Sequence, residues 1–315
     1  MEKPKTRIVV VCGPTASGKS ALAVDVAKKL GGEIINADSM QVYKGMDIAN
    51  ATPSECERGG VPHHIFGIIE PSSAFSVAEW LSLARGKIAE VAARSALPVI
   101  VGGTGLYISS LIDNIIFDDI GQDTTFRNEM YALAAQRGNA FLLDMLRDVD
   151  SSAAEVLHEN NTKRIVRALE TYKHGGADLR TRLEKSRSES SPYDALVFGT
   201  CFSDRAKLYE RINKRVDMML AAGLLDEARF AVADFAANPT SSQAIGHKEL
   251  AAYISGTETL EVCVENLKRK TRNYAKRQLT WFRKVRGLQW LLMDSEDDYA
   301  QSFDKIVSQV AGYEK

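Results

Sequence analysis

Short apolar runs recur along the chain and alternate with longer stretches that have helical periodicity. Four runs contain no polar residue: residues 8–11, 34–35, 98–101 and 195–198. Strands of a parallel sheet are buried on both faces and therefore read as continuous apolar runs. Helices between such strands place the strands side by side in one sheet. The pattern predicts an α/β core with a mainly parallel sheet flanked by helices.

Residues 118–195 interrupt this alternation. They show amphipathic helical patterning without strand-like runs, and a charged, serine-rich stretch at residues 184–192 closes them. Strand character returns at Ala195, so the insertion leaves and returns on the same side of the sheet. We expect a discontinuous core of residues 1–117 and 196–315, with an all-helical insertion domain of residues 118–195.

One long helix is predicted over residues 260–286, because apolar residues recur there every three or four positions. Its other face is basic, and no acidic residue lies between Lys268 and Arg286. Such a face either contacts nucleic acid or is simply solvated, and the lack of interspersed glutamate favours a row of phosphates as its partner. The residues that share one stripe are Arg269, Arg272, Lys276 and Arg283.

The composition narrows the class of protein. With 315 residues and 45% hydrophobic content, the chain is long enough for one large domain or two smaller ones. No apolar stretch reaches the roughly 18 residues of a membrane span, and residues 1–5 contain no signal-peptide core. The four cysteines form no C-x-x-C pair, so we expect reduced packing residues. We therefore expect a cytoplasmic protein without membrane contact, and a monomer.

The first apolar run leads directly into a complete G-x-x-x-x-G-K-[ST] motif. In this phosphate-binding loop (P-loop) the glycines let consecutive N–H groups point at one anion, and the lysine adds a cation. The serine hydroxyl can hold Mg2+, which makes Ser20 the candidate metal ligand. The context agrees, because residues 21–30 have helical character. A polyphosphate ligand is predicted for the loop, whose residues are Gly13, Pro14, Thr15, Ala16, Ser17, Gly18, Lys19 and Ser20.

Asp38 follows the second predicted strand. Ligands of α/β sheets bind at the carboxyl ends of the strands, so Asp38 should face the same crevice as the P-loop. Three roles are open for it. It is a Walker B acid that holds Mg2+ for phosphoryl transfer, a general base for an incoming nucleophile, or a solvated loop carboxylate.

The third predicted strand ends in Gly102-Gly103-Thr104-Gly105, which supplies no carboxylate. Its backbone N–H groups and the Thr104 hydroxyl form a neutral donor set. Such a set suits hydrogen bonding to a diphosphate that gains charge as it departs. The glycines alone are a weak signal, because they also mark close packing of a helix on a strand.

One pair of arginines and one pair of histidines are further candidates for a functional role. Arg211 and Arg215 lie four residues apart on one predicted helical face, from which both can reach the phosphate crevice or pair with surface carboxylates. His63 and His64 are adjacent and lack the H-x-x-x-H spacing and the nearby cysteine of a zinc site. For the histidines we favour a loop pair satisfied by hydrogen bonds.

Six segments together make the chain similar, over nearly its full length, to the tRNA dimethylallyltransferases, also called tRNA isopentenyltransferases. That family transfers a dimethylallyl group from dimethylallyl diphosphate to N6 of the adenine next to the anticodon, at position 37. The resemblance implies that the P-loop binds this diphosphate rather than using ATP, and that tRNA is the partner. The matching segments are residues 13–20, 38–43, 62–64, 102–107, 163–170 and 271–278.

The resemblance also implies roles for individual residues. Asp38 becomes the general base that removes the proton of the adenine amine. Lys19, Mg2+ at Ser20, Thr104 and Arg215 would stabilise the leaving diphosphate, and Arg211 would help to bind it. The insertion would grip the anticodon stem-loop while the adenine flips out of its stack. The implied tRNA contacts are Ser39, Met40, Gln41, Lys163, Arg164, Arg167, Arg272, Lys276 and Arg277.

The chain departs from the family pattern at two places. Residues 47–53 stand where a Gly-Thr-Ala-Lys-Pro segment is usual, and His247 stands where tyrosine is commoner. Neither departure removes a catalytic group. Both leave open whether Asn50 and His247 contact tRNA.

Three other functions would use the same P-loop. A small-molecule P-loop kinase would use a lid of arginines and would not need a long basic helix. An adenylate isopentenyltransferase shares the chemistry but acts on free nucleotide. A non-catalytic RNA-binding regulator would use the loop as a nucleotide switch. The helical insertion and the basic helix favour a polynucleotide acceptor.

Overall fold

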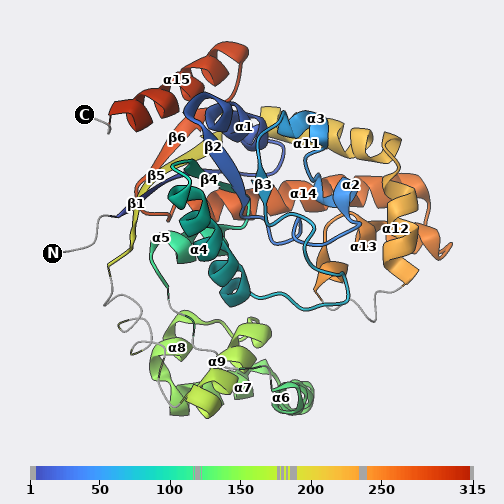
Figure 1. Cartoon of the computed structure of the whole chain (residues 1–315). Coiled ribbons are helices and arrows are strands. Elements are labelled where there is room, and N and C mark those ends of the chain that lie inside the picture. Colours follow the sequence, from blue (N-terminus) through green and yellow to red (C-terminus); the bar gives the residue numbers. More distant parts are fainter. Residues whose placement is uncertain are drawn as a thin grey trace. The chain divides into compact units, whose positions relative to one another are not determined.

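The computed structural model describes residues 5–115, 117, 121, 123–175, 178, 181, 184, 190–233 and 240–312. The chain divides into two compact units, drawn in Figure 1. The core unit comprises residues 1–112 and 192–315, and the helical unit comprises residues 113–191. Both divisions fall a few residues before the boundaries expected from the sequence.

The core unit contains a six-stranded sheet in the order β3-β2-β4-β1-β5-β6, and all of its pairings are parallel. The four predicted runs form β1, β2, β4 and β5, so the α/β fold with a parallel sheet is confirmed. The sequence did not predict the edge strands, because β3 is only two residues long and Gln289 interrupts β6. The strands are β1 (Thr6–Cys12), β2 (Gly32–Asn36), β3 (His63–His64), β4 (Leu97–Gly102), β5 (Tyr193–Cys201) and β6 (Leu288–Leu292).

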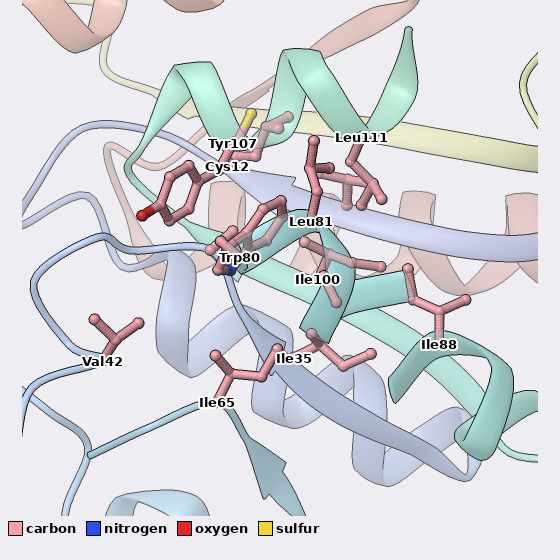
Figure 2. Close-up of a cluster of buried hydrophobic side chains, with 14 of the residues drawn as sticks. Cys12, Ile35, Val42, Ile65, Trp80, Leu81, Ile88, Ile100, Tyr107 and Leu111 are labelled. Carbon is pink, nitrogen blue, oxygen red and sulfur yellow. The ribbon is translucent and has the colours of Figure 1, made fainter. Parts of the chain in front are cut away.

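Helices cover both faces of the sheet (Figure 1). On one face, α1 (Lys19–Leu30) and α15 (Glu296–Gly312) pack with alternate side chains of β1. On the other face, α4 (Val77–Ala93) and α5 (Gly105–Ile112) enclose a second cluster, shown in Figure 2. There the rings of Trp80 and Tyr107 stack with centroids 4.5 Å apart. Because both faces are buried, the sheet is rigid enough to position the loops at its carboxyl edge.

A layer of helices lies at the carboxyl edge of the sheet. Its elements are α2 (Asp47–Asn50), α3 (Glu55–Arg58), α11 (Arg205–Ala221), α12 (Leu224–Ala233), the 3-10 helix η2 (Ser241–Gln243), α13 (His247–Ile254) and α14 (Leu260–Phe282). Helices α11 to α14 share an apolar cluster around Val216 and Leu267. The predicted long helix is present but ends at Phe282, and the Lys284 N–H then bonds the Trp281 carbonyl, three residues back, as in a turn. Arg283 directly follows the helix, and its backbone is still in the right-handed helical region.

The helical unit has its own apolar core. It contains α6 (Thr124–Arg137), α7 (Asn139–Val149), α8 (Ser151–Val156) and α9 (Thr162–Gly175). Leu142, Leu146 and Ile165 are fully buried in this core. Most of the charged, serine-rich stretch lies outside the described residues. Strand β5 begins at Tyr193, slightly before the boundary expected at residue 195.

Two further expectations were that the cysteines are packing residues and that no segment spans a membrane. Cys12 and Cys263 are buried free thiols, but Cys56 is exposed, so its assignment as a packing residue is wrong. In the described part of the chain, every helix is too short or too polar to cross a bilayer.

Candidate active site

The P-loop joins β1 to α1 and is held in shape by close contacts. Gly18 has a φ of 85°, a left-handed conformation that glycine adopts without strain. A Cβ atom at Gly13 would lie 2.1 Å from Thr200 Oγ1, so a side chain does not fit there. The Thr200 hydroxyl lies 2.6 Å from Ser17 Oγ. Thr200, from β5, therefore fixes a loop that lies far away in the sequence.

Two positive charges meet at this loop. Lys19 begins α1, and Arg215 reaches the same place from α11. Burial and the charge of Arg215 lower the pKa of Lys19 to about 8. Burial also lowers the pKa of Arg215, although the charge of Asp38 partly offsets this effect. Cations whose charged forms are disfavoured in this way gain stability when an anion binds beside them.

Arg211 lies one turn before Arg215 and contacts the loop directly. Its Nε donates a hydrogen bond to the Ala16 carbonyl, at 3.0 Å. Its guanidinium also lies over the ring of Phe202, 5.6 Å from the centroid. Both predicted arginines therefore reach the P-loop. Among the described residues neither forms an ion pair with a carboxylate, which was the alternative prediction.

A cavity of about 840 Å³, which we call the phosphate cavity, opens beside the P-loop. Lys19, Arg211 and Arg215 supply its cationic wall, and Met218 and Met219 of α11 supply apolar surface. The segment after the Asp38 loop adds Asp47, Ile48, Ala51, Thr52 and Pro53 to the lining. Cations next to apolar side chains suit a ligand with an anionic head and a short apolar chain.

Asp38 lies just beyond the end of β2, where side-chain hydrogen bonds hold its backbone. Asn36 accepts the Asp38 N–H at 2.8 Å and donates to the Asp38 carbonyl at 3.1 Å. The Asp38 Oδ1 atom accepts the Met40 N–H at 3.0 Å. Within the described chain, Oδ2 has no such bond. The carboxylate thus has one oxygen free to accept a proton.

Asp38 lines a second cavity of about 260 Å³, which we call the acceptor cavity. The predicted residues Ser39, Met40 and Gln41 line it as well. The two cavities adjoin, because they share part of their lining. A group held by the P-loop therefore lies next to a group held beside Asp38. The shared residues are Lys19, Ser20, Gln41, Ala51, Arg215 and Met219.

Thr104 lies directly before α5, and its predicted contact with the diphosphate stays a prediction. It supports the loop that carries Asp38 and is not among the residues that line either cavity. Its Oγ1 accepts the Ser39 N–H at 2.9 Å and lies 3.2 Å from Ser39 Oγ. Its own N–H donates to the Ala37 carbonyl at 3.1 Å. To donate to a leaving diphosphate, the Thr104 hydroxyl would first have to leave Ser39.

Gln278 of α14 joins the two loops of the site, and we did not predict it. The Thr15 N–H donates to Gln278 Oε1 at 2.9 Å, and Gln278 Nε2 donates to the Gly103 carbonyl at 2.9 Å. A Cβ atom at Gly103 would lie 2.3 Å from that Nε2. Gln278 is also 5% exposed and lines the acceptor cavity. The only signal for it was its place in the segment 271–278.

Part of the basic face of α14 is already engaged within the core unit. Lys268 pairs with a carboxylate of α11 at 2.7 Å. The Arg272 Nη1 atom donates to Asn213 Oδ1 at 2.7 Å. Lys276 and Arg277 are exposed, and Arg277 lines the acceptor cavity. Lys276 and Arg277 are therefore better placed than Arg272 to contact an external phosphate.

The predicted basic residues of the helical unit lie on α9. Lys163 and Arg164 are exposed, but Arg167 pairs with Glu170, whose side chain is fully buried. Arg127 binds the same carboxylate at 2.8 Å. Burial would raise the pKa of Glu170, but the hydrogen bonds from the two arginines prevail and lower it. Arg167 thus has a structural partner that competes with an external ligand.

The histidine pair forms β3, so the predicted loop is wrong. His63 Nδ1 lies 2.8 Å from the Val61 carbonyl, and His64 Nε2 lies 2.6 Å from Glu33 Oε2. Both rings therefore have hydrogen-bond partners within the protein, as the favoured interpretation required.

The two departures from the family pattern also make contacts inside the core unit. Asn50 Nδ2 donates to the Met40 carbonyl at 2.8 Å. His247 has no exposed surface, and its Nε2 lies 2.7 Å from Glu227 Oε1. A fully buried His247 does not contact tRNA directly.

Ser20 is exposed and lines both cavities. The described residues contain no cluster of three or more histidine, cysteine or acidic side chains suited to a metal. Magnesium bound to phosphates keeps several waters and needs only one or two protein oxygens. A single hydroxyl beside Lys19 therefore fits Mg2+ that is held mainly by a bound polyphosphate.

Comparison with known proteins assigns the family. The IPP transferase family model matches residues 41–285, and the isopentenyl transferase model matches residues 6–63. The chain is 45% identical to the tRNA dimethylallyltransferase of Bacillus licheniformis and 44% identical to that of Bacillus subtilis, in each case over 312 residues and 99% of both chains.

Solved structures agree with these sequence matches. The tRNA isopentenylpyrophosphate transferase of Bacillus halodurans is 42% identical, with a TM-score of 0.72 over 98% of this chain and 96% of that one. A eukaryotic dimethylallyltransferase, solved acting on tRNA, is 26% identical, with a TM-score of 0.83 over 98% of this chain and 79% of that one. The chain belongs to the tRNA dimethylallyltransferase family.

Proposed function

We propose that the protein transfers the dimethylallyl group of dimethylallyl diphosphate to N6 of the adenine next to the anticodon, position 37, of tRNA, with release of diphosphate. The observation that carries the proposal is the meeting of two cavities at Lys19 and Arg215. One cavity has the cations and apolar wall that a prenyl diphosphate needs. The other holds a carboxylate beside which a flipped base can lie.

The P-loop binds the diphosphate. Its backbone N–H groups, Lys19, Arg211 and Arg215 surround the oxygens, although the Thr15 N–H is already bonded to Gln278. The bond between C1 of the allyl group and the diphosphate oxygen breaks, and its electron pair leaves with the diphosphate. Cations fixed beside the oxygens stabilise this growing charge, which usually supplies the largest part of the catalytic effect.

Mg2+ would be held by the Ser20 hydroxyl together with oxygens of the diphosphate. When bound, it neutralises part of the charge on the leaving group. Thr104 is a candidate for the same task only if its hydroxyl turns away from Ser39. In the arrangement described, its direct effect is to hold the loop that carries Asp38.

Asp38 acts as the general base. The adenine N6 attacks C1, the new N6–C1 bond forms, and the amine proton passes to the Asp38 oxygen that has no other hydrogen bond. Oδ1 stays bonded to the Met40 N–H, which keeps the carboxylate oriented. An exocyclic amine is a weak nucleophile, so removal of its proton contributes a factor of about 10² to 10⁴ in rate.

The tRNA is bound mainly through its backbone. Ser39, Met40 and Gln41 line the acceptor cavity and would contact the flipped adenine and its neighbours. Lys276 and Arg277 offer exposed charges at the same side of the core unit, while Arg272 would first have to leave Asn213. The helical unit would grip the anticodon stem-loop. Its contacts would be Lys163, Arg164 and, in competition with Glu170, Arg167.

One assay tests the proposal. Purified protein is mixed with labelled dimethylallyl diphosphate and either tRNA or AMP, and labelled product is measured in a single turnover. We expect transfer to tRNA only; transfer to AMP would favour an adenylate isopentenyltransferase. ATP replaces the prenyl donor in a third reaction, in which phosphoryl transfer would favour a kinase.

The variant Asp38→Asn tests the general base. It should keep tRNA affinity within a few-fold and lower the prenylation rate by about 10² to 10⁴. A rate above a third of that of the unmodified protein would contradict the role of Asp38 as the base.

A further inference from the structure

The Glu227 carboxylate joins three segments of the core unit. It lies on α12, and its side chain is 11% exposed. Its Oε2 accepts the Ile48 N–H at 2.8 Å, and its Oε1 accepts the Ala49 N–H at 2.9 Å. The Oε1 atom also lies 2.7 Å from His247 Nε2, on α13. The carboxylate therefore fixes the start of α2 to α12 and α13.

Helix α2 depends on this external partner. It is four residues long, and Met46, the residue before it, makes no side-chain cap. The first N–H groups of a helix have no partner within the helix, so an acceptor must come from elsewhere. Glu227 is that acceptor, and it lies far away in the sequence.

Helix α2 is in turn bonded to the loop that carries Asp38. The Asn50 side chain donates to the Met40 carbonyl at 2.8 Å. In the opposite direction, the Gln41 side chain donates to the carbonyls of Asn50 and Ala51, both at 3.0 Å. The Met40 N–H is the group that bonds the Asp38 carboxylate. Hydrogen bonds, together with the backbone of α2 and of Met40, thus connect Glu227 to Asp38.

The same segment lines both cavities. Asp47, Ile48 and Ala51 belong to the lining of the phosphate cavity, and Ala49, Asn50 and Ala51 belong to that of the acceptor cavity. A shift of α2 would therefore change the space for the prenyl chain and the position of Asp38 together. Misplacement of reacting groups by about 1 Å costs on the order of 10² in rate.

The charge of Glu227 and the hydrogen bond from His247 suit a fixed connection between α12, α13 and α2. Burial would raise the pKa of Glu227, but the hydrogen bonds from His247, Ala49 and Ile48 prevail and lower it, so the carboxylate stays charged. His247 Nδ1 has no hydrogen-bond partner among the described residues. Because a carboxylate only accepts hydrogen bonds, the Nε2–H of His247 is the donor in this contact.

We propose that Glu227 and His247 are positioning residues, which hold residues 47–51 against the Asp38 loop and thereby set both the prenylation rate and the size limit for the prenyl chain. The inference rests on the proposed transfer of a prenyl group. Neither residue lines the phosphate cavity or the acceptor cavity, so each acts through α2. The assignment also explains why His247, a departure from the family pattern, is buried rather than facing tRNA.

Three variants test the link. Glu227→Gln keeps the shape but turns an N–H₂ group toward one of the donors. His247→Phe keeps a ring and removes the donor, whereas His247→Gln restores a donor. The matched control is Glu249→Gln, since Glu249 is also buried but, among the described residues, its carboxylate bonds only the N–H of Gly246, the N-cap of its own helix.

The first measurement is the single-turnover prenylation of tRNA, compared at equal folded fraction. Glu227→Gln and His247→Phe should lose about tenfold or more in rate, while His247→Gln should recover most of it. Affinity for dimethylallyl diphosphate should change by less than about threefold, because the P-loop is intact. The rate ratio of geranyl to dimethylallyl diphosphate should rise in both impaired variants.

The second measurement is hydrogen exchange of the peptide that contains residues 47–51, which needs no activity. Exchange should speed up in Glu227→Gln and His247→Phe, but not in Glu249→Gln. Unchanged exchange and rate in both variants would overturn the proposal, as would an equal loss in the control. If the unmodified protein failed to prenylate tRNA, the proposed function would fail, while the exchange result would still test the link itself.

Discussion

Raising the pH should weaken the binding of dimethylallyl diphosphate through a single lysine. The pKa of Lys19 is lowered to about 8 in the free site, so its charge is complete well below pH 8 and is lost above it. The anionic diphosphate restores the charged form in the complex, so binding above pH 8 takes up a proton. From the titration of one such group, we expect Kd to rise about tenfold between pH 7 and 9, or about 1.4 kcal/mol.

The Cys12 thiol and the phosphates of the ligand do not titrate in this window. Burial raises the pKa of Cys12, at the end of β1, to about 12. The last ionisation of a phosphate ester falls near a pKa of about 6, so the ligand keeps its charge throughout.

Direct binding by calorimetry, in buffers that differ in ionisation enthalpy, measures both Kd and proton uptake. At pH 8 the uptake should be about half a proton. The control is Lys19→Arg, whose guanidinium stays charged and should make Kd independent of pH over this range. A Kd constant within twofold from pH 7 to 9, or the same slope in Lys19→Arg, would refute the assignment.

Three further predictions concern stability and tRNA binding. Gln278→Leu leaves two backbone groups without partners and should lower the free energy of unfolding by about 2 to 4 kcal/mol. Denaturant titration measures this change. An unchanged midpoint of the unfolding transition would mean that water replaces the amide. In the helical unit, the pKa values of Glu170 and Asp123 are lowered, that of Asp123 to about 2. The ionised carboxylates therefore stabilise this unit at pH values above the usual carboxyl pKa, and this stability is lost as the pH falls from about 4.5 toward 2. Circular dichroism during acid titration should show an acid transition, which Glu170→Gln should weaken. Replacing Lys276 and Arg277 by alanine should flatten the slope of log K for tRNA against log salt by about 1 to 2, with the affinity for the prenyl diphosphate unchanged. An unaltered slope would exclude phosphate contacts by this pair.

Local patterns in the sequence were sufficient for much of the architecture. Continuous apolar runs predicted β1, β2, β4 and β5, because strands buried on both faces consist mostly of apolar residues. The P-loop motif and the place of Asp38 after β2 were equally visible, since glycine spacing and strand ends are local features. The edge strand β6 escaped prediction because a strand at the border of a sheet needs no continuous apolar run.

The family resemblance predicted more about the roles of individual residues than the periodicity of the sequence did. It chose general-base catalysis for Asp38 among three open roles, and it implied the tRNA contacts. It could not say which basic residues are hydrogen-bonded or ion-paired to other side chains. Arg272 and Arg167 carry the same charge as Arg277, but the first two have partners, Asn213 and Glu170, that only the folded chain brings to them.

The chain by itself therefore determined which loops carry the chemistry, and the tertiary structure decided how those loops are held. Gln278 connects two loops, and Glu227 caps α2 from another helix. The Thr104 hydroxyl accepts the Ser39 N–H and so supports the loop that carries Asp38. Periodicity and motifs report the neighbours of a residue along the chain. Hydrogen bonds between distant segments depend on how helices and strands pack, and that information lies in the complete set of contacts rather than in any local pattern.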